Sequence, residues 1–249
     1  MKIFIVNCGS SSIKYQVFDM TDESVLAKGL VERLGSGEAE LEHYVDGECH
    51  EIKLPAANHT EGVQHILATL TDPKIGVLAS VDEIQGVGHR VVHGGEALTE
   101  SVRIDEAVLE TIRQMIPLAP LHNPANLAGI EAAMSAMPSV PHVAVFDTAF
   151  HATMPPAAFR YAVPEDWYTD HFVRRYGFHG TSHRFVSQRM AEILGKPADE
   201  VNLITCHLGN GGSICAIQGG KSVDTSMGLT PLEGIVMGTR CGDIDPAII

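Results

Sequence analysis

The sequence predicts an α/β fold of two lobes, each built on a mixed β-sheet flanked by helices. One local pattern occurs twice: an apolar strand, a turn of small polar residues and a returning strand, at 3–19 and again at 201–217. Strands come first along the chain, and helices then alternate with strands, as in α/β proteins. The length of 249 residues and the 45% hydrophobic content allow one large domain or two ordinary ones.

The first ninety residues contain mainly strands. Apolar segments at 3–6, 13–19 and 25–34 predict three of them, and 39–45 and 49–54 flank Asp46-Gly47, a strong hairpin signal. Apolar residues at 63, 66, 67 and 70 follow helical spacing. The segment 84–93 predicts a buried strand that ends at Gly94-Gly95.

Two helices and a strand complete the first lobe. Asp105 can cap a helix that carries the apolar residues between 108 and 116. Asn123 as the cap and Pro124 in the first turn predict the start of another helix, which continues to about Met137. A short strand at 142–146 ends at Asp147, and we expect a boundary there, with lobes at 1–150 and 151–249.

The second lobe begins after chain breaks at Pro155-Pro156 and Pro164. Residues 179–182 introduce a helix with apolar residues at 185, 186, 190, 193 and 194, which ends at Gly195 and Pro197. Strands at 201–206 and 214–217 then flank the turn 207–213, and Gly219-Gly220 leads into 221–226. Asp245 and Pro246 are suited to the start of a helix, so we expect the chain to be a fragment with an incomplete second lobe.

Composition excludes several classes of partner. The net charge of −14 opposes binding to nucleic-acid phosphates and to anionic membranes. No apolar segment is long enough to span a bilayer, and the N-terminus does not resemble a signal peptide. Five cysteines without a Cys-x-x-Cys pair predict reduced thiols in a cytoplasmic protein, where they serve as small core residues.

The first turn carries polar groups suited to phosphate. Asn7, Ser10, Ser12 and Lys14 offer amide and hydroxyl donors and one cation at the end of a strand. The Walker spacing is absent, so this turn is not a P-loop. Taken alone, the pattern is more typical of an ordinary hairpin turn. The second turn favours a ligand role, because it is rich in glycine, as where backbone closely approaches a ligand.

Three further residues are candidates for charge chemistry. Arg90 and Arg240 lie among glycines and apolar residues, where a guanidinium would match a carboxylate or phosphoryl group; a structural ion pair is the alternative. Asp147 ends a strand, as a ligand of hydrated Mg²⁺ often does, and a capping role is the alternative.

Thirteen histidines are many for this length. His179 and His183 are four residues apart on a predicted helix, but a third ligand at diagnostic spacing is missing, so zinc is not expected. His122 and His179 occur in loops bounded by Gly or Pro, where they suit hydrogen bonding to a developing anion.

Taken together, these motifs resemble the acetate kinase family over essentially the whole chain. The matching segments lie in collinear order at 7–14, 88–96, 119–124, 146–151, 176–183, 207–213 and 224–234, followed by the Arg240 segment. The resemblance implies two ribonuclease-H-like lobes around a nucleotide cleft, as in sugar kinases, Hsp70 and actin. It also implies reversible, Mg²⁺-dependent phosphorylation of acetate by ATP, giving acetyl phosphate and ADP, in a homodimer.

The resemblance also implies roles for individual residues. The first phosphate loop would comprise Asn7, Ser10, Ser12 and Lys14, with Asn7 near the Mg²⁺ ion, and the second His207, Gly209, Asn210 and Gly211. Arg90 and Arg240 would contact the acetyl and γ-phosphoryl groups, with Asp147, His122 and His179 as the remaining active-site residues. The pocket for the acetate methyl would consist of Val92, Leu121, Phe178 and Pro231.

Two alternatives remain open. One methylene group changes binding by only about 1–3 kcal/mol, so a propionate or other short-chain acyl kinase is possible although Val92 favours acetate. The other alternative is a non-catalytic nucleotide-binding module. The chain lacks the part that in the family completes the adenosine site, so we expect it to be inactive alone.

Overall fold

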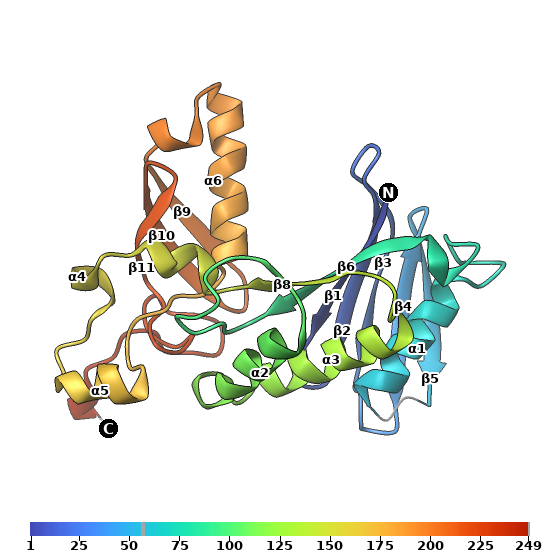
Figure 1. Cartoon of the computed structure of the whole chain (residues 1–249), viewed down its shortest axis with the longest axis horizontal. Coiled ribbons are helices and arrows are strands. Elements are labelled where there is room, and N and C mark those ends of the chain that lie inside the picture. Colours follow the sequence, from blue (N-terminus) through green and yellow to red (C-terminus); the bar gives the residue numbers. More distant parts are fainter. Residues whose placement is uncertain (56–57, 249) are drawn as a thin grey trace. The chain divides into compact units, whose positions relative to one another are not determined.

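The computed structural model describes residues 1–55 and 58–248, which form two compact units (Figure 1). The first unit comprises Met1–Val91 and Val102–Val145, and the second comprises Val92–Ser101 and the chain from Phe146 onward. Each unit combines helices with a β-sheet, which confirms the predicted α/β class. The division into lobes at residue 150 stays a prediction, and the two units are described separately below.

The large sheet has eight strands in the order β5-β4-β3-β2-β1-β6-β8-β7. It is mixed, because β1 runs parallel to β6 while β1 to β5 form an antiparallel meander. The strands are β1 (Lys2–Cys8), β2 (Ile13–Asp19), β3 (Ser24–Glu32), β4 (Ala39–Val45), β5 (Glu48–Leu54), β6 (Ile84–Val91), β7 (Val102–Arg103) and β8 (His142–Phe146). The short strand β7 was not predicted.

Helices α1 (His59–Leu70) and α3 (Asn123–Ala136) cover one face of this sheet (Figure 1). Alternation along β1 and β2 turns one set of side chains toward the helices, where Phe4, Ile13 and Tyr15 are almost fully buried. Residues such as Val63, Ile66 and Leu70 complete that core from α1. The opposite face of β1 and β2 carries both apolar and polar side chains, among them Ile5, Asn7, Lys14 and Gln16.

Two helix starts were predicted in the first unit, at Asp105 and at Asn123, and the first is confirmed. Asp105 caps α2 (Glu106–Gln114) by accepting a hydrogen bond from the amide of Val108, and Asn58, which was not predicted as a cap, caps α1. Asn123, in contrast, lies inside α3 and not at its cap. Its side chain is buried and donates to the carbonyl of Ile112, so it joins α3 to α2.

The second unit contains a smaller antiparallel sheet in the order β11-β10-β9. Its elements are α4 (Pro156–Phe159), α5 (Glu165–His171), α6 (Gly180–Leu194), β9 (Leu203–Leu208), β10 (Gly212–Gln218) and β11 (Lys221–Thr225). The prolines expected only to break the chain also open α4 and precede α5, since proline suits the first helical turn. Asp245 and Pro246 begin a 3₁₀ turn, Pro246–Ile248.

The predicted second turn, 207–213, is shorter in the structure. His207 and Ser213 face each other as paired residues of β9 and β10, so the turn proper is Gly209–Gly211. Extended pairing continues to the ends of both strands because small residues there allow a tight reversal. The side chain of His207 therefore takes its direction from a strand.

Two general properties concern the whole described chain. No helix within residues 1–55 and 58–248 is long and apolar enough to cross a bilayer. Each of the five cysteines is a free thiol, and Cys8 and Cys215 are the buried ones.

Gly29 makes room for a buried tyrosine. Tyr15 lies opposite it on β2, and a methyl group at residue 29 would approach both the Tyr15 ring and the Glu42 carbonyl oxygen to 2.5 Å. The Tyr15 hydroxyl donates to His43 Nδ1 at 2.7 Å, and His43 Nε2 in turn donates to the carbonyl of Ile75 at 2.9 Å.

We expect Gly29→Ala to destabilise the protein by about 1–3 kcal/mol, the usual cost of overpacking. The Tyr15 ring would have to move, and its bond to His43 would be lost. Urea unfolding monitored by circular dichroism measures this effect, with the exposed neighbour Lys28→Ala as the control. Equal midpoints for the two variants would contradict this account.

Candidate functional site

The first polar turn, between β1 and β2, is closed by a backbone hydrogen bond and anchored on its β1 side. The amide of Gly9 donates to Ser12 O at 2.8 Å, and His59 Nε2 at the start of α1 donates to Gly9 O at 2.7 Å. The buried Asn126 of α3 donates to Cys8 O at 2.7 Å. The turn that holds Ser10 and Ser12 is therefore tied to both helices beneath the sheet.

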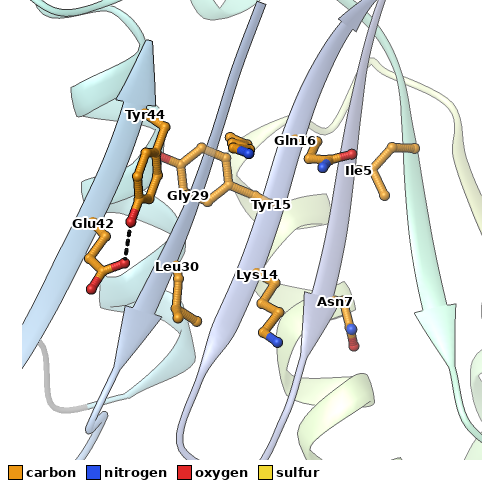
Figure 2. A pocket seen from close by; sticks show the side chains of 10 residues that line it. Ile5, Asn7, Lys14, Tyr15, Gln16, Gly29, Leu30, Glu42 and Tyr44 are labelled. Atoms are coloured by element: carbon orange, nitrogen blue, oxygen red, sulfur yellow. Dashed lines mark hydrogen bonds between the residues drawn. The ribbon is translucent and has the colours of Figure 1, made fainter. Parts of the chain in front are cut away.

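Asn7 and Lys14 lie directly opposite each other on β1 and β2, with their side chains on the face away from the helices. Figure 2 shows them side by side at one end of a pocket of about 510 Å³ that continues across β3 and β4. Gln16 and Ile5 line its other end, and Tyr44 donates to Glu42 at 2.9 Å on its far side. An amide and a lysine at the strand ends form a polar group beside the turn.

Arg90 belongs to the same polar group. It lies near the end of β6, the strand parallel to β1, and its Nη1 donates to Asn7 Oδ1 at 3.3 Å. His122 immediately precedes α3, one turn before Asn126, so it lies near the same end of β1. Leu121 is 76% exposed. The first unit thus holds Arg90, Asn7 and Lys14 near one another, with His122 at the same end.

In the second unit, Asp147 and His179 are joined through the backbone. Asp147 is buried directly after β8, and its carbonyl accepts a hydrogen bond from the amide of Gly180 at 2.8 Å. Gly180 begins α6, and His179 precedes it with a left-handed backbone, φ 58°. Few non-glycine residues adopt this conformation, which is enriched at strained functional positions.

The second turn brings three predicted residues together. A methyl group at Gly211 would lie 3.1 Å from Arg240 Nη2 and 3.3 Å from His179 Nε2. The guanidinium and the imidazole therefore both face the Gly211 backbone. His207 stacks on His179 with ring centroids 4.0 Å apart. Asn210 is exposed at the tip of the turn, next to Gly209.

Arg240 is positioned by a reverse turn and not by a helix or strand. The amide of Met237 donates to Arg240 O at 2.9 Å, which closes the turn 237–240. The Nη1 atom of Arg240 donates to the carbonyl of Pro231 at 2.5 Å. Pro231 is thereby held next to the guanidinium, in the loop that follows β11.

The other predicted pocket residues of the second unit are buried. Val92 and Phe178 are each 3% exposed. His151 Nε2 donates to Phe178 O at 2.9 Å, which fixes the backbone beside His179. Burial holds His151 neutral by lowering its pKa to about 4. Leu121, the fourth pocket residue, belongs to the first unit.

Sequence reasoning missed a network of hydroxyl groups around these histidines. Ser213 Oγ lies 2.9 Å from His179 Nδ1 and 2.8 Å from His183 Nε2, and Ser182 Oγ lies 2.9 Å from His207 Nδ1. The i, i+4 spacing of His179 and His183 was the available signal. It was considered only as a pair of metal ligands, whereas the structure joins the two rings through a serine.

Comparison with known proteins decides the family. The model of the acetokinase family matches residues 2–249. The chain belongs to the acetokinase family. It is 61% identical to an acetate kinase of Symbiobacterium thermophilum over its whole length, which is 63% of that relative.

Solved structures of related kinases share the fold. The Porphyromonas gingivalis acetate kinase is 50% identical with a TM-score of 0.96, and a Francisella tularensis propionate kinase is 42% identical with a TM-score of 0.92. The chain is covered to 99% in both comparisons and spans 62% of each of those chains. The acetokinase fold is thus confirmed.

The family resemblance implies a Mg²⁺ ion. The side chains of this acetokinase chain show whether suitable ligands for that ion are present. Within the described ranges, no three or more His, Cys, Asp or Glu side chains gather into a metal cage. Mg²⁺ bound with a nucleotide keeps several waters and needs only one or two carboxylates. The buried carboxylate of Asp147 in the second unit fits that requirement, and in the first unit the side chain of Asn7 offers an amide oxygen.

Gly180→Ala should separate Asp147 from α6 of this acetokinase chain. The added methyl group would lie 2.4 Å from Asp147 O, so the carbonyl and the helix start would have to move apart. We expect a loss of about 1–3 kcal/mol in stability from this overlap. Urea unfolding measures it. Gly238→Ala is the control, since a methyl group there meets nothing within 4 Å, and equal midpoints would contradict the overlap.

Proposed function

We propose that the protein containing this chain is an acetate kinase that transfers the γ-phosphoryl group of ATP reversibly to acetate, giving acetyl phosphate and ADP. Membership of the acetokinase family supports the proposal. The observation that carries it is the convergence of His179 and Arg240 on the backbone of Gly211. Because the chain spans about 62% of its relatives, the proposal concerns the full-length protein.

The proposed reaction needs alignment and charge compensation, and no general base. Acetate is ionised near neutral pH, so its oxygen can attack phosphorus directly, in line with the leaving ADP. Negative charge on the phosphoryl oxygens is then best stabilised by fixed donors. Arg90 and Arg240 supply guanidinium groups, and His122 and His179 supply imidazole donors.

The two turns would hold the phosphates of the nucleotide. Asn7, Ser10, Ser12 and Lys14 form the first set of donors in the proposal. The second set comprises His207, Gly209, Asn210 and Gly211. Glycines in the second turn allow the backbone amides to approach phosphate oxygens closely.

Asn7 is proposed to lie at the Mg²⁺ ion, and Asp147 is proposed to orient the site and to serve as a further ligand of the metal. Mg²⁺ bound with ATP would neutralise charge that develops on the phosphate oxygens. The carboxylate of Asp147 is kept in place by burial and by the backbone bond to Gly180. A role in proton abstraction is not required.

The substrate pocket would be small and apolar. Val92, Leu121, Phe178 and Pro231 are the proposed lining of the acetate methyl. The Francisella tularensis relative is a propionate kinase, so propionate is a second candidate substrate. A full-length homodimer and a cytoplasmic location are further parts of this proposal.

A non-catalytic nucleotide-binding module is the alternative from another class. Such a module needs no site for an acyl group. The presence of Arg90, Arg240 and the residues proposed for the apolar pocket favours the kinase over the module.

Trapping of acyl phosphate with hydroxylamine tests the function. The full-length protein is incubated with Mg-ATP and either acetate or propionate, and the hydroxamate is measured. Rapid formation with acetate supports the proposal, and faster formation with propionate would change the substrate. Calorimetric ATP binding without hydroxamate from either acid would overturn the kinase and favour the module.

A further inference from the structure

A continuous chain of hydrogen bonds leads from the core of the second unit to His179. Thr205 Oγ1 on β9 lies 2.8 Å from His183 Nδ1 on α6. His183 Nε2 lies 2.8 Å from Ser213 Oγ on β10, and Ser213 Oγ lies 2.9 Å from His179 Nδ1. Thr205, His183 and Ser213 are each at most 5% exposed, so water does not compete for the two bonds among them, whereas the bond to His179 is partly buried.

The hydrogen atoms of this chain can be arranged consistently in one direction. If Thr205 donates to His183 Nδ1, then His183 Nε2 carries the hydrogen and donates to Ser213 Oγ. Ser213 then donates to His179 Nδ1. In the opposite direction the Thr205 hydroxyl hydrogen would be buried without an acceptor among the described side-chain contacts, at a cost of about 1–3 kcal/mol. The first direction is therefore favoured.

The arrangement in which hydrogen bonds run from Thr205 through His183 to Ser213 requires a neutral His183 ring. Burial is the main cause that lowers the His183 pKa to about 3, and the neighbouring rings of His151, His179 and His207 lower it further. The ring thus has one N–H, as the arrangement requires. Its second nitrogen must accept a hydrogen bond, and Thr205 provides the donor.

The backbone of His179 turns its ring toward this chain. The residue occupies the N-cap position of α6, but its side chain does not cap the helix. The left-handed backbone instead brings Nδ1 to Ser213. His179 Nε2 consequently points to the Gly211 backbone, beside Arg240 Nη2.

We propose that Ser213 and His183 are positioning residues that hold His179 as the tautomer with its hydrogen on Nε2, directed at the transferred phosphoryl group. The hydrogen bond at one ring nitrogen decides which nitrogen carries the proton. That the phosphoryl group accepts the hydrogen bond from His179 Nε2 rests on the proposed function. The tautomer itself does not depend on that function.

The first test measures the tautomer directly. Long-range ¹H–¹⁵N spectra of the full-length protein, labelled with ¹⁵N-histidine and free of ligands, distinguish protonated from unprotonated ring nitrogens at pH 8. We expect the His179 resonances to report hydrogen on Nε2 in the wild type. In Ser213→Ala, the donor to Nδ1 is lost and we expect a mixture of tautomers.

The second test uses a matched serine as control. Ser187 on α6 is 6% exposed, and its hydroxyl donates to the carbonyl of Arg184 at 2.8 Å, so it is not bonded to a histidine of this chain of hydrogen bonds. Ser213→Ala should lower kcat about 10- to 100-fold with little change in the KM for ATP, the usual range for residues that orient a functional group. Ser187→Ala should retain kcat within about twofold.

The outcomes separate this proposal from the proposed function. Hydrogen on His179 Nδ1 in the wild type, or an unchanged tautomer and kcat in Ser213→Ala, would overturn the positioning role. If the full-length protein makes no acyl phosphate but the tautomer responds to Ser213→Ala, the positioning role stands and the kinase proposal fails. The wild-type spectrum decides the tautomer even if the variant does not fold.

Discussion

Arg90→Ala and Arg240→Ala in the full-length protein should each lower kcat by about 10²–10³-fold, the loss expected when a fixed donor to a developing charge is removed. Both guanidinium groups are held in place before substrate binds. Arg90 donates to Asn7, and Arg240 donates to the carbonyl of Pro231. A preorganised cation of this kind stabilises the transition state more than the ground state, so kcat is the parameter that should fall.

Each unit offers a control for this prediction. Arg113 on α2 and Arg189 on α6 are exposed and pair with glutamates of the surface. Their alanine variants should retain kcat within about twofold, since exposed ion pairs contribute little. Hydroxamate formation at saturating ATP and acetate measures all four variants. Near-normal turnover of either Arg90→Ala or Arg240→Ala would remove that arginine from the proposed site.

Much of the first unit could be predicted because its local signals agree with its packing. Alternating apolar residues define β1 and β2, and Asp46-Gly47 gives the β4–β5 hairpin its turn. The cap at Asp105 starts α2 as expected. Asn123 was wrongly assigned as a cap because a residue that favours caps can equally satisfy its amide in the core. Its bond to Ile112 depends on a contact between helices, which no local pattern encodes.

Helix α6 shows a different limit of sequence patterns. Its apolar residues were expected to mark a helix, and the helix is present, but Phe185 and Ile193 are each 66% exposed. The buried side consists of small or polar residues such as His183, Ser187 and Ala191. Helical spacing shows that a face exists, whereas neighbouring elements decide which face is covered. A close helix–sheet contact here favours small side chains.

The sequence indicated which residues are candidates for the site, but it did not indicate how those residues are arranged in space. Glycines and polar residues identified both turns, yet the short turn Gly209–Gly211 depends on how far β9 and β10 pair. Ser213 was overlooked because a serine on a strand carries no distinctive signal. Its importance depends on two histidines, His179 and His183, that reach it from another element.

Acidification should unfold this protein well above the pH at which carboxylates titrate, because several histidines are buried in neutral form. Burial lowers the pKa of His89 and His183 to about 3 and that of His93 and His151 to about 4, from an ordinary value of 6.5. The unfolded chain therefore binds more protons than the native state below pH 6.5. Stability contributed by these groups is full above pH 6.5 and falls as the pH decreases toward their native pKa values.

The size of this effect follows from the difference in bound protons. When the unfolded state binds one proton more than the native state, the free energy of unfolding falls by about 1.4 kcal/mol for each pH unit of acidification. Each fully buried histidine therefore lowers the free energy of unfolding by about 2 kcal/mol between pH 6.5 and pH 5. Four such groups approach the whole stability of an ordinary domain. Urea midpoints measured at pH 8, 7, 6 and 5 should thus be nearly constant at first and then drop steeply.

The pH window distinguishes histidines from acidic residues. Carboxylates with lowered pKa values, such as Asp19, Asp72 and Glu83, have ordinary values of 3.8 or 4.5, so their contribution is lost only below about pH 4.5. His89→Gln should reduce the slope between pH 6 and 5 by up to about 1.4 kcal/mol per pH unit, because one proton fewer is taken up. The exposed His171 provides the matched control, and His171→Gln should leave the slope unchanged. A midpoint that stays constant down to pH 5 would show that the buried rings are protonated in the native state.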